Sequence, residues 1–196
     1  MQTAARPTLI DALLPAARLP AWARNALLAV GGSLLLTLSA KINVPFYPVP
    51  LSMQTFAVLA IGAAFGWRLG TATVLLYLAE GAAGLPVFAG TPEKGIGLAY
   101  MMGPTGGYLI GFVAGAAVVG WLAERGWDRS FLLLTAAMFI GHVAIFVLGA
   151  GWLATIVSIE KAWVLGVAPF YLATVFKTLL AAACIKAGWS AANLRG

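Results

Sequence analysis

Residues 131–152 read FLLLTAAMFIGHVAIFVLGAGW, a stretch that contains no Asp, Glu, Lys or Arg. An α-helix needs about 20 mostly apolar residues to cross the hydrocarbon core of a bilayer. The stretch therefore predicts a transmembrane helix. A transmembrane β-barrel would instead show alternating segments of about ten residues, and the sequence lacks them.

The rest of the chain repeats this pattern, with 62% hydrophobic residues, 9% charged residues and a mean hydropathy of +0.95. A soluble domain carries about 25% charged residues, which excludes that class. We predict an all-α polytopic membrane protein with a single six-helix domain over residues 24–190, preceded by a cytoplasmic interfacial segment, 1–23. The predicted spans are 24–42, 51–67, 69–86, 104–123, 131–152 and 169–189.

The basic residues predict the orientation of these spans. Eight Lys and Arg residues fall on the side of the two termini and three fall on the other side, while Lys177 lies within a span. Because cytoplasmic loops carry the excess of Lys and Arg, both termini should be cytoplasmic. The connections 41–50, 87–103 and 153–168 then face outward, and the last of them should be partly helical.

Several classes of function lack their signatures. The net charge of +6 comes without a basic run, so nucleic acid is not an expected partner. Motifs for hydrolases, metalloproteases and ATP binding are missing. A single His and a single Cys give poor support for a metal site or a Cys–His nucleophile. We expect no enzyme activity, no cofactor and no metal, and we expect Cys184 to be a small apolar side chain.

Glycines repeat at a spacing of four residues in two places. Gly103, Gly107, Gly111 and Gly115 form one face of the fourth span, and Gly62, Gly66 and Gly70 lie across the second connection. Such stripes allow another backbone to approach closely. We predict close helix packing at both.

Lys177 is the most informative single side chain. It lies about 12 Å into its span, at 1.5 Å per residue from a start near residue 169, and an ammonium at that depth needs a partner. An anionic ligand is one solution, and a structural pair with Glu80 or bonds to backbone carbonyls are the others. Phe170 and Thr174 share its helical face.

The segment 41–56, KINVPFYPVPLSMQTF, holds three prolines in six positions and then enters a span. We interpret it as a rigid rim of a pocket. Gln54 can donate and accept together, which suits a urea or amide ligand, although an interhelical hydrogen bond is an equal alternative. Asn43 has either a local hydrogen-bonding role in this loop or a ligand contact.

The fourth span opens with GPTGGYLIGF at 103–112. Thr105 either caps the helix or contacts a ligand, and Tyr108 lies one turn further along. We interpret His142 as a satisfied interhelical hydrogen-bonding group, with a proton relay as the alternative.

Together the segments 41–56, 103–112 and 76–90, LYLAEGAAGLPVFAG, resemble the BioY family, the biotin-binding S components of energy-coupling factor (ECF) transporters. The resemblance covers residues 25–190. It implies a six-helix protein of the plasma (inner) membrane with an outward-facing vitamin pocket, and it makes Phe88 of the outer segment a predicted substrate-binding residue. The implied partners are a transmembrane coupling protein and two ABC-type ATPases, although some members lack dedicated partners.

The family pattern in the sixth span is only partly present. Pro169, Phe170 and Lys177 match it, but Thr174 stands where an acidic residue is expected. The resemblance implies that Lys177 lies near the biotin carboxylate, while the ureido ring would contact Thr174, Gln54 or the 87–103 loop. Uptake of another small vitamin, a membrane-embedded enzyme and an assembly protein are the rival hypotheses, and self-association stays open.

Overall fold

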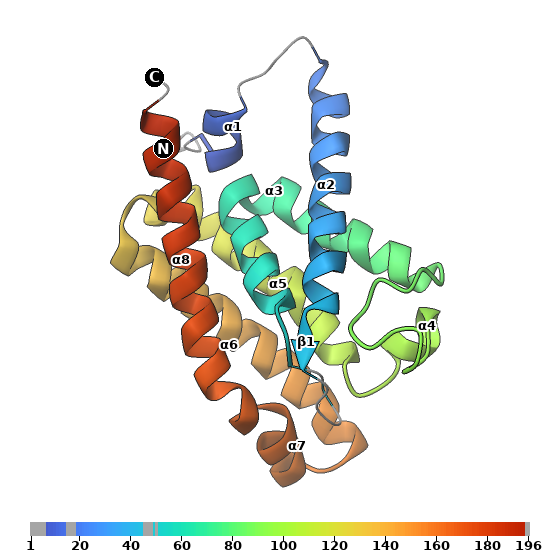
Figure 1. Ribbon diagram of the computed structural model, residues 1–196. Helices are drawn as coiled ribbons and strands as arrows, with labels where there is room; N and C mark the ends of the chain where they lie inside the picture. Colours follow the sequence, from blue (N-terminus) through green and yellow to red (C-terminus); the bar gives the residue numbers. More distant parts are fainter. Residues whose placement is uncertain (1–6, 15–18, 45–48, 50, 195–196) are drawn as a thin grey trace, which may run out of the picture.

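Long apolar helices form most of the computed structural model, which describes residues 7–14, 19–44, 49 and 51–194 (Figure 1). Within these residues, five segments are long and apolar enough to cross a membrane. They contain the helices α2 (Ala21–Lys41), α3 (Gln54–Ala82), α5 (Gly106–Ala123), α6 (Phe131–Ile156) and α8 (Tyr171–Asn193). Exposed Leu side chains such as Leu132 and Leu172 lie on the outside of the bundle, as a lipid-facing surface requires.

The helix α3 contains both the second and the third predicted spans. It is broken at Gly66, where φ is 78° and ψ is 173°. A side chain at Gly66 would collide with Glu124, whose carboxylate accepts a hydrogen bond of 3.0 Å from the Trp67 N–H. The six-helix architecture is therefore confirmed, but no separate loop joins these two spans, and the second half of α3 ends at Ala82 rather than at residue 86.

Short elements connect the long helices. They are α1 (Leu9–Leu13), β1 (Asn43–Val44), β2 (Leu51–Ser52), α4 (Gly97–Met101), η1 (Trp127–Arg129), α7 (Ile159–Gly166) and η2 (Ala168–Phe170). The strands pair antiparallel, with Asn43 opposite Ser52. Prolines 45, 48 and 50 of the predicted rim lie outside the described residues.

The first helix and the end of the last helix lie at the same end of the bundle, as predicted (Figure 1). Figure 1 shows α1 and the end of α8 together at one end, with the strands, α4 and α7 toward the other. The predicted helical content of 153–168 is confirmed by α7. At the end that carries the termini, Leu9 of α1 is buried and lies against Gly188 of α8, and Arg24 forms an ion pair of 3.0 Å with Asp11. The described part of the N-terminal segment thus packs on the bundle.

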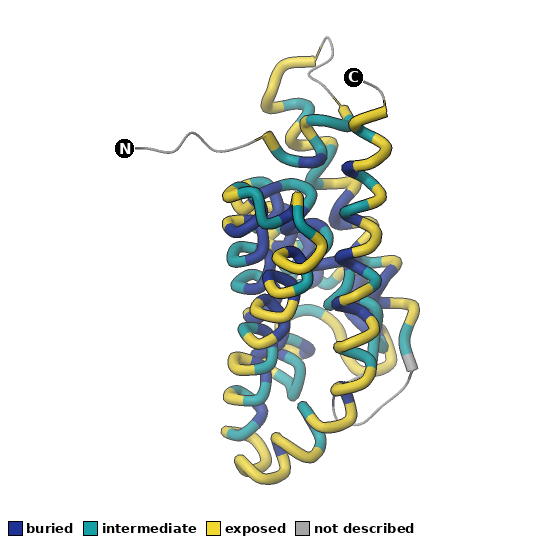
Figure 2. Tube along the Cα trace, turned by 90° about the vertical axis from the view of Figure 1, so that its left-hand side faces the viewer, coloured by how far each residue is buried: buried dark blue, intermediate teal, exposed yellow. Residues whose placement is uncertain are grey.

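The helix α5 lies in the interior and packs closely on its neighbours. Added methyl groups at Gly107 and Gly111 would collide with α6, at Trp152 and Ile145 respectively. An added methyl group at Gly62 would likewise meet the backbone of Ala116. The glycine stripes therefore have the packing role that we predicted. Figure 2 shows the result, with buried segments toward the middle and exposed ones outside.

Candidate functional site

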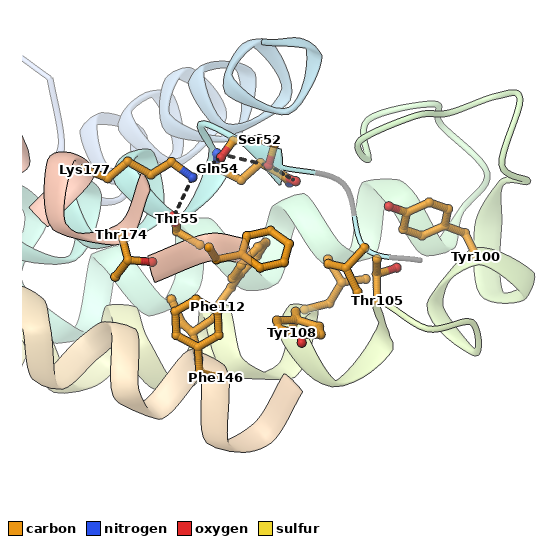
Figure 3. A pocket seen from close by; sticks show the side chains of 14 residues that line it. Ser52, Gln54, Thr55, Tyr100, Thr105, Tyr108, Phe112, Phe146, Thr174 and Lys177 are labelled. Carbon is orange, nitrogen blue, oxygen red and sulfur yellow. Dashed lines mark hydrogen bonds between the residues drawn. The ribbon is translucent and has the colours of Figure 1, made fainter. Parts of the chain in front are cut away.

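A cavity of about 50 Å³ lies between α3, α5, α6 and α8, close to β2. One of its ends is polar and the opposite end is aromatic (Figure 3). Its lining comprises Val49, Ser52, Gln54, Thr55, Tyr100, Thr105, Tyr108, Leu109, Phe112, Ile145, Phe146, Phe170, Thr174 and Lys177.

Lys177 forms the polar end of the cavity and is only 6% exposed. Its Nζ donates hydrogen bonds to the Ser52 backbone oxygen at 2.5 Å and to Thr55 Oγ1 at 3.5 Å. The alternative pairing with Glu80 is not formed, because Glu80 instead accepts a bond of 2.5 Å from Ser33 Oγ. The two oxygens that accept from the ammonium are therefore neutral, and they satisfy its hydrogens without cancelling its charge.

Gln54 lies beside Lys177 at the start of α3 and is 5% exposed. Its Nε2 donates to the Tyr77 hydroxyl oxygen at 2.6 Å, and its Oε1 accepts from Ser52 Oγ at 3.1 Å. The predicted interhelical hydrogen bond is thus present, from the first half of α3 to the second. An amide has two N–H groups and two acceptor positions, so one of each is left by these bonds.

Aromatic rings form the walls of the cavity. The rings of Tyr108 and Phe146 have centroids 6.4 Å apart, and those of Phe146 and Phe170 are 6.1 Å apart. Phe112 completes this group, which is suited to a flat or aliphatic ligand. The Tyr108 hydroxyl donates to the Gly166 backbone oxygen at 2.8 Å, which ties α5 to α7.

Tyr100 closes the aromatic end from α4 (Figure 3). Its hydroxyl donates to the Ala89 backbone oxygen at 2.9 Å. Burial raises the pKa of this hydroxyl, and a hydrogen bond with Thr105 only partly offsets the effect. The group is therefore a neutral hydrogen-bonding group, not a charge, at physiological pH.

Most of the predicted binding residues come together in this cavity. Lys177, Gln54, Thr174, Tyr108, Thr105 and Phe170 all line it. The other two, Phe88 and Asn43, do not line it. Phe88 is fully buried behind the cavity wall and stacks on Tyr100 at 5.0 Å. Asn43 donates its amide to the Ala40 backbone oxygen at 2.9 Å and lines a neighbouring, more open hollow that also reaches Lys177.

His142 does not line the cavity. Its Nδ1 lies 3.1 Å from the Met138 backbone oxygen and 3.1 Å from Thr178 Oγ1. These contacts join α6 to α8 and support the interhelical role. Within the described residues, no group of three or more His, Cys, Asp and Glu side chains is placed to hold a metal ion.

Eight lining residues are not among the predicted binding residues: Val49, Ser52, Thr55, Tyr100, Leu109, Phe112, Ile145 and Phe146. Phe112 had a usable signal, because it lies one helical turn after Tyr108 and shares its face. Phe146 is one of three phenylalanines in its span, and the sequence does not distinguish it from Phe131 and Phe139. Ser52 accepts from Lys177 through its backbone oxygen, and no residue type reveals such a contact.

Comparison with known proteins identifies the family. A sequence model of the BioY family matches residues 8–194. The chain belongs to the BioY family. A biotin transporter BioY from Thermotoga maritima is 40% identical over 149 residues, and the matched part covers 76% of this chain and 85% of the relative.

A second BioY relative, the biotin transporter BioY of Rhizobium etli, is 36% identical, with 75% of this chain and 81% of the relative covered. A crystal structure of the S-component for biotin from an ECF-type ABC transporter matches with a TM-score of 0.72. It covers 84% of this chain and 90% of that one at 22% identity, and it shows that this BioY chain has the S-component fold. Both relatives are named biotin transporters.

Proposed function

We propose that the protein binds biotin at the outer face of the membrane and mediates its uptake. The observation that carries this proposal is the buried ammonium of Lys177, which faces neutral oxygens at one end of an aromatic cavity. Biotin combines one carboxylate, one urea and an apolar body. A cation, an amide and a set of aromatic walls complement these three parts.

Each part of the ligand has a proposed partner. Lys177 binds the carboxylate, for which it exchanges its bond to the Ser52 oxygen. Gln54 and Thr174 face the ureido ring, and Thr105 contributes a further hydroxyl. The rings of Tyr108 and Phe170, with Phe112 and Phe146, pack against the apolar body. Asn43 and Phe88 support the surrounding structure.

The cavity must widen before biotin can enter. Its volume of about 50 Å³ is well below the roughly 300–1,000 Å³ that is usual for small-molecule sites. The bond between Lys177 and Ser52 joins α8 to β2. Its release would free the outer hairpin, which is formed by β1 and β2, to move. We assign the covering role to the outer connections 41–50 and 87–103.

Uptake needs an energy source, and the sequence carries no ATP-binding motif. We assign that role to an ECF coupling protein and two ABC-type ATPases in the plasma membrane, with action by the chain alone as the alternative. The test is uptake of radiolabelled biotin by cells that lack their own biotin transporter. Cells that express this chain with the ECF module should accumulate the label, and unchanged uptake relative to the empty vector would refute transport.

A further inference from the structure

We propose that Tyr77 is a positioning residue that fixes the orientation of the Gln54 amide, and thereby selects a urea over a guanidine in the ligand. This inference rests on the proposed function. Tyr77 belongs to the second half of α3, does not line the cavity and is fully buried. Its hydroxyl is nonetheless bonded directly to the side chain that we place at the ureido ring.

The direction of the hydrogen bonds around Tyr77 is determined by a backbone carbonyl. The Tyr77 hydroxyl donates to the Val87 backbone oxygen at 3.1 Å, and a carbonyl can only accept. The single hydroxyl hydrogen is used there, so the Tyr77 oxygen must accept from Gln54 at 2.6 Å. Gln54 therefore turns its NH₂ group toward Tyr77 and its oxygen toward Ser52.

A second set of contacts holds the Tyr77 ring in place. The ring meets Phe88 edge-on, with centroids 5.4 Å apart and an interplanar angle of 84°. Lys41 Nζ in turn donates to the backbone oxygens of Phe88 at 3.2 Å and Thr91 at 3.0 Å. The predicted residue Phe88 thus acts on the cavity through Tyr77.

The orientation of Gln54 decides what a ligand meets. After the bonds to Tyr77 and Ser52, the amide retains one N–H donor and one acceptor position. The edge of a urea offers a carbonyl acceptor beside an N–H donor and matches this pair. In 2-iminobiotin a nitrogen replaces the ureido oxygen, and its protonated guanidine offers only donors. The remaining Gln54 N–H would then face another donor, and an unmade buried bond costs affinity.

The test compares affinities for biotin and 2-iminobiotin at neutral pH in purified protein. Tyr77→Phe removes one oxygen atom and lets the Gln54 amide turn over. The preference for biotin over 2-iminobiotin should fall roughly tenfold. Both affinities come from the same preparation, so a partial loss of folded protein cancels in their ratio. An unchanged ratio in a variant that still binds biotin would overturn the inference.

Tyr108→Phe is the matched control. It also removes a buried hydroxyl that donates to a backbone carbonyl, at Gly166, but this hydroxyl is bonded neither to Gln54 nor to Thr105 in the described structure. The affinities of this control variant for biotin and for 2-iminobiotin should fall by the same factor, so that their ratio is preserved. A fall in the ratio as large as that of Tyr77→Phe would show a general effect of losing a buried hydroxyl and would contradict the inference.

Two further variants locate the effect at Gln54. In a Gln54→Ala background, Tyr77→Phe should leave the ratio unchanged, because the group that it positions is gone; a further fall would overturn the inference. Gln54→Glu retains Tyr77 and presents only acceptors to the ligand. This variant should therefore bind 2-iminobiotin more tightly than biotin, and a retained preference for biotin would contradict the inference. If the unaltered chain binds neither compound, the proposed function itself fails.

Discussion

The Lys177 ammonium donates a hydrogen bond of 2.5 Å to the backbone oxygen of Ser52, which lies 125 residues earlier in the chain. The bond joins the last long helix to the outer hairpin beside the cavity. A carbonyl dipole satisfies a buried cation less well than a carboxylate does, because it brings no opposite charge. An anionic ligand can therefore compete for Lys177, and its binding would be coupled to release of the hairpin.

Replacement of Lys177 should weaken biotin binding selectively. Lys177→Ala should lower the affinity for biotin by about tenfold to a hundredfold, the loss expected for a charge-assisted hydrogen bond. The affinity for biotin amide, which lacks the negative charge, should fall much less. Isothermal titration calorimetry with both ligands measures the two effects.

Lys161→Ala is the control for this variant, since it removes an exposed lysine of α7 on the same side of the bundle. It should leave both affinities unchanged. Equal losses for biotin and biotin amide in Lys177→Ala would remove the assignment of Lys177 to the carboxylate.

Close packing between α5 and α6 should make Gly111 intolerant of even one methyl group. An added Cβ there would meet the backbone of Ile145, and overpacking costs about 1–3 kcal/mol. Gly111→Ala should therefore lower the melting temperature of the detergent-solubilised protein. Gly151→Ala in α6 is the matched change, because an added Cβ there has no neighbour within 4 Å. That variant should melt no lower than the unaltered chain, and a fall equal to that of Gly111→Ala would contradict the packing account.

The fold could be predicted from the sequence to a large extent, because hydropathy and charge directly determine which segments cross a bilayer. The residues at which the helices begin and end were harder to predict. The α6 helix continues to Ile156, beyond the predicted residue 152, since residues 153–156, Leu-Ala-Thr-Ile, carry no signal that ends a helix. The joining of two spans at Gly66 depends on a backbone angle and on the bond from the Trp67 N–H to Glu124, 57 residues further along the chain.

Ser33 and Glu80 should contribute to stability as a pair. The bond from Ser33 Oγ to the Glu80 carboxylate links α2 to α3, and Ser33 is fully buried. Ser33→Ala should cost about 1–3 kcal/mol, because it removes a donor from a partly buried carboxylate. Thermal unfolding measures the loss.

Thr37→Ala provides the comparison for Ser33→Ala. The Thr37 hydroxyl bonds only within its own helix in the described structure, to the Ser33 backbone oxygen. Its removal should have a distinctly smaller effect on the melting temperature. Similar losses for the two variants would show that the link between α2 and α3 is energetically unimportant.

The N-terminal helix α1 should lose support in acid. Burial alone would raise the pKa of Asp11, but hydrogen bonds from Thr8 and Arg24 outweigh it and hold that pKa below its usual 3.8. A lowered folded-state pKa contributes stability above the unfolded value, and the contribution disappears as the pH falls through the folded pKa. The melting temperatures of the unaltered chain and Asp11→Asn should therefore differ at neutral pH and converge below pH 3.8. A difference that is independent of pH would contradict this assignment.

The candidate site was predictable only where a residue type is unusual for its surroundings. Lys177 and Gln54 stand out because they are polar within apolar spans, and both line the cavity. Phe88 packs behind the cavity wall, which the sequence does not reveal, because an aromatic residue in an outer segment can equally well line a site or pack behind it. The partner of Lys177 was inaccessible, since any residue can supply a backbone oxygen and only the fold brings that of Ser52 within reach.

Equilibrium binding of biotin to the purified chain, with other small vitamins as competitors, tests the central claim most directly. We expect saturable binding that unlabelled biotin displaces and that unrelated vitamins do not. Absence of measurable biotin binding by a folded preparation, with good binding of another vitamin, would contradict the account.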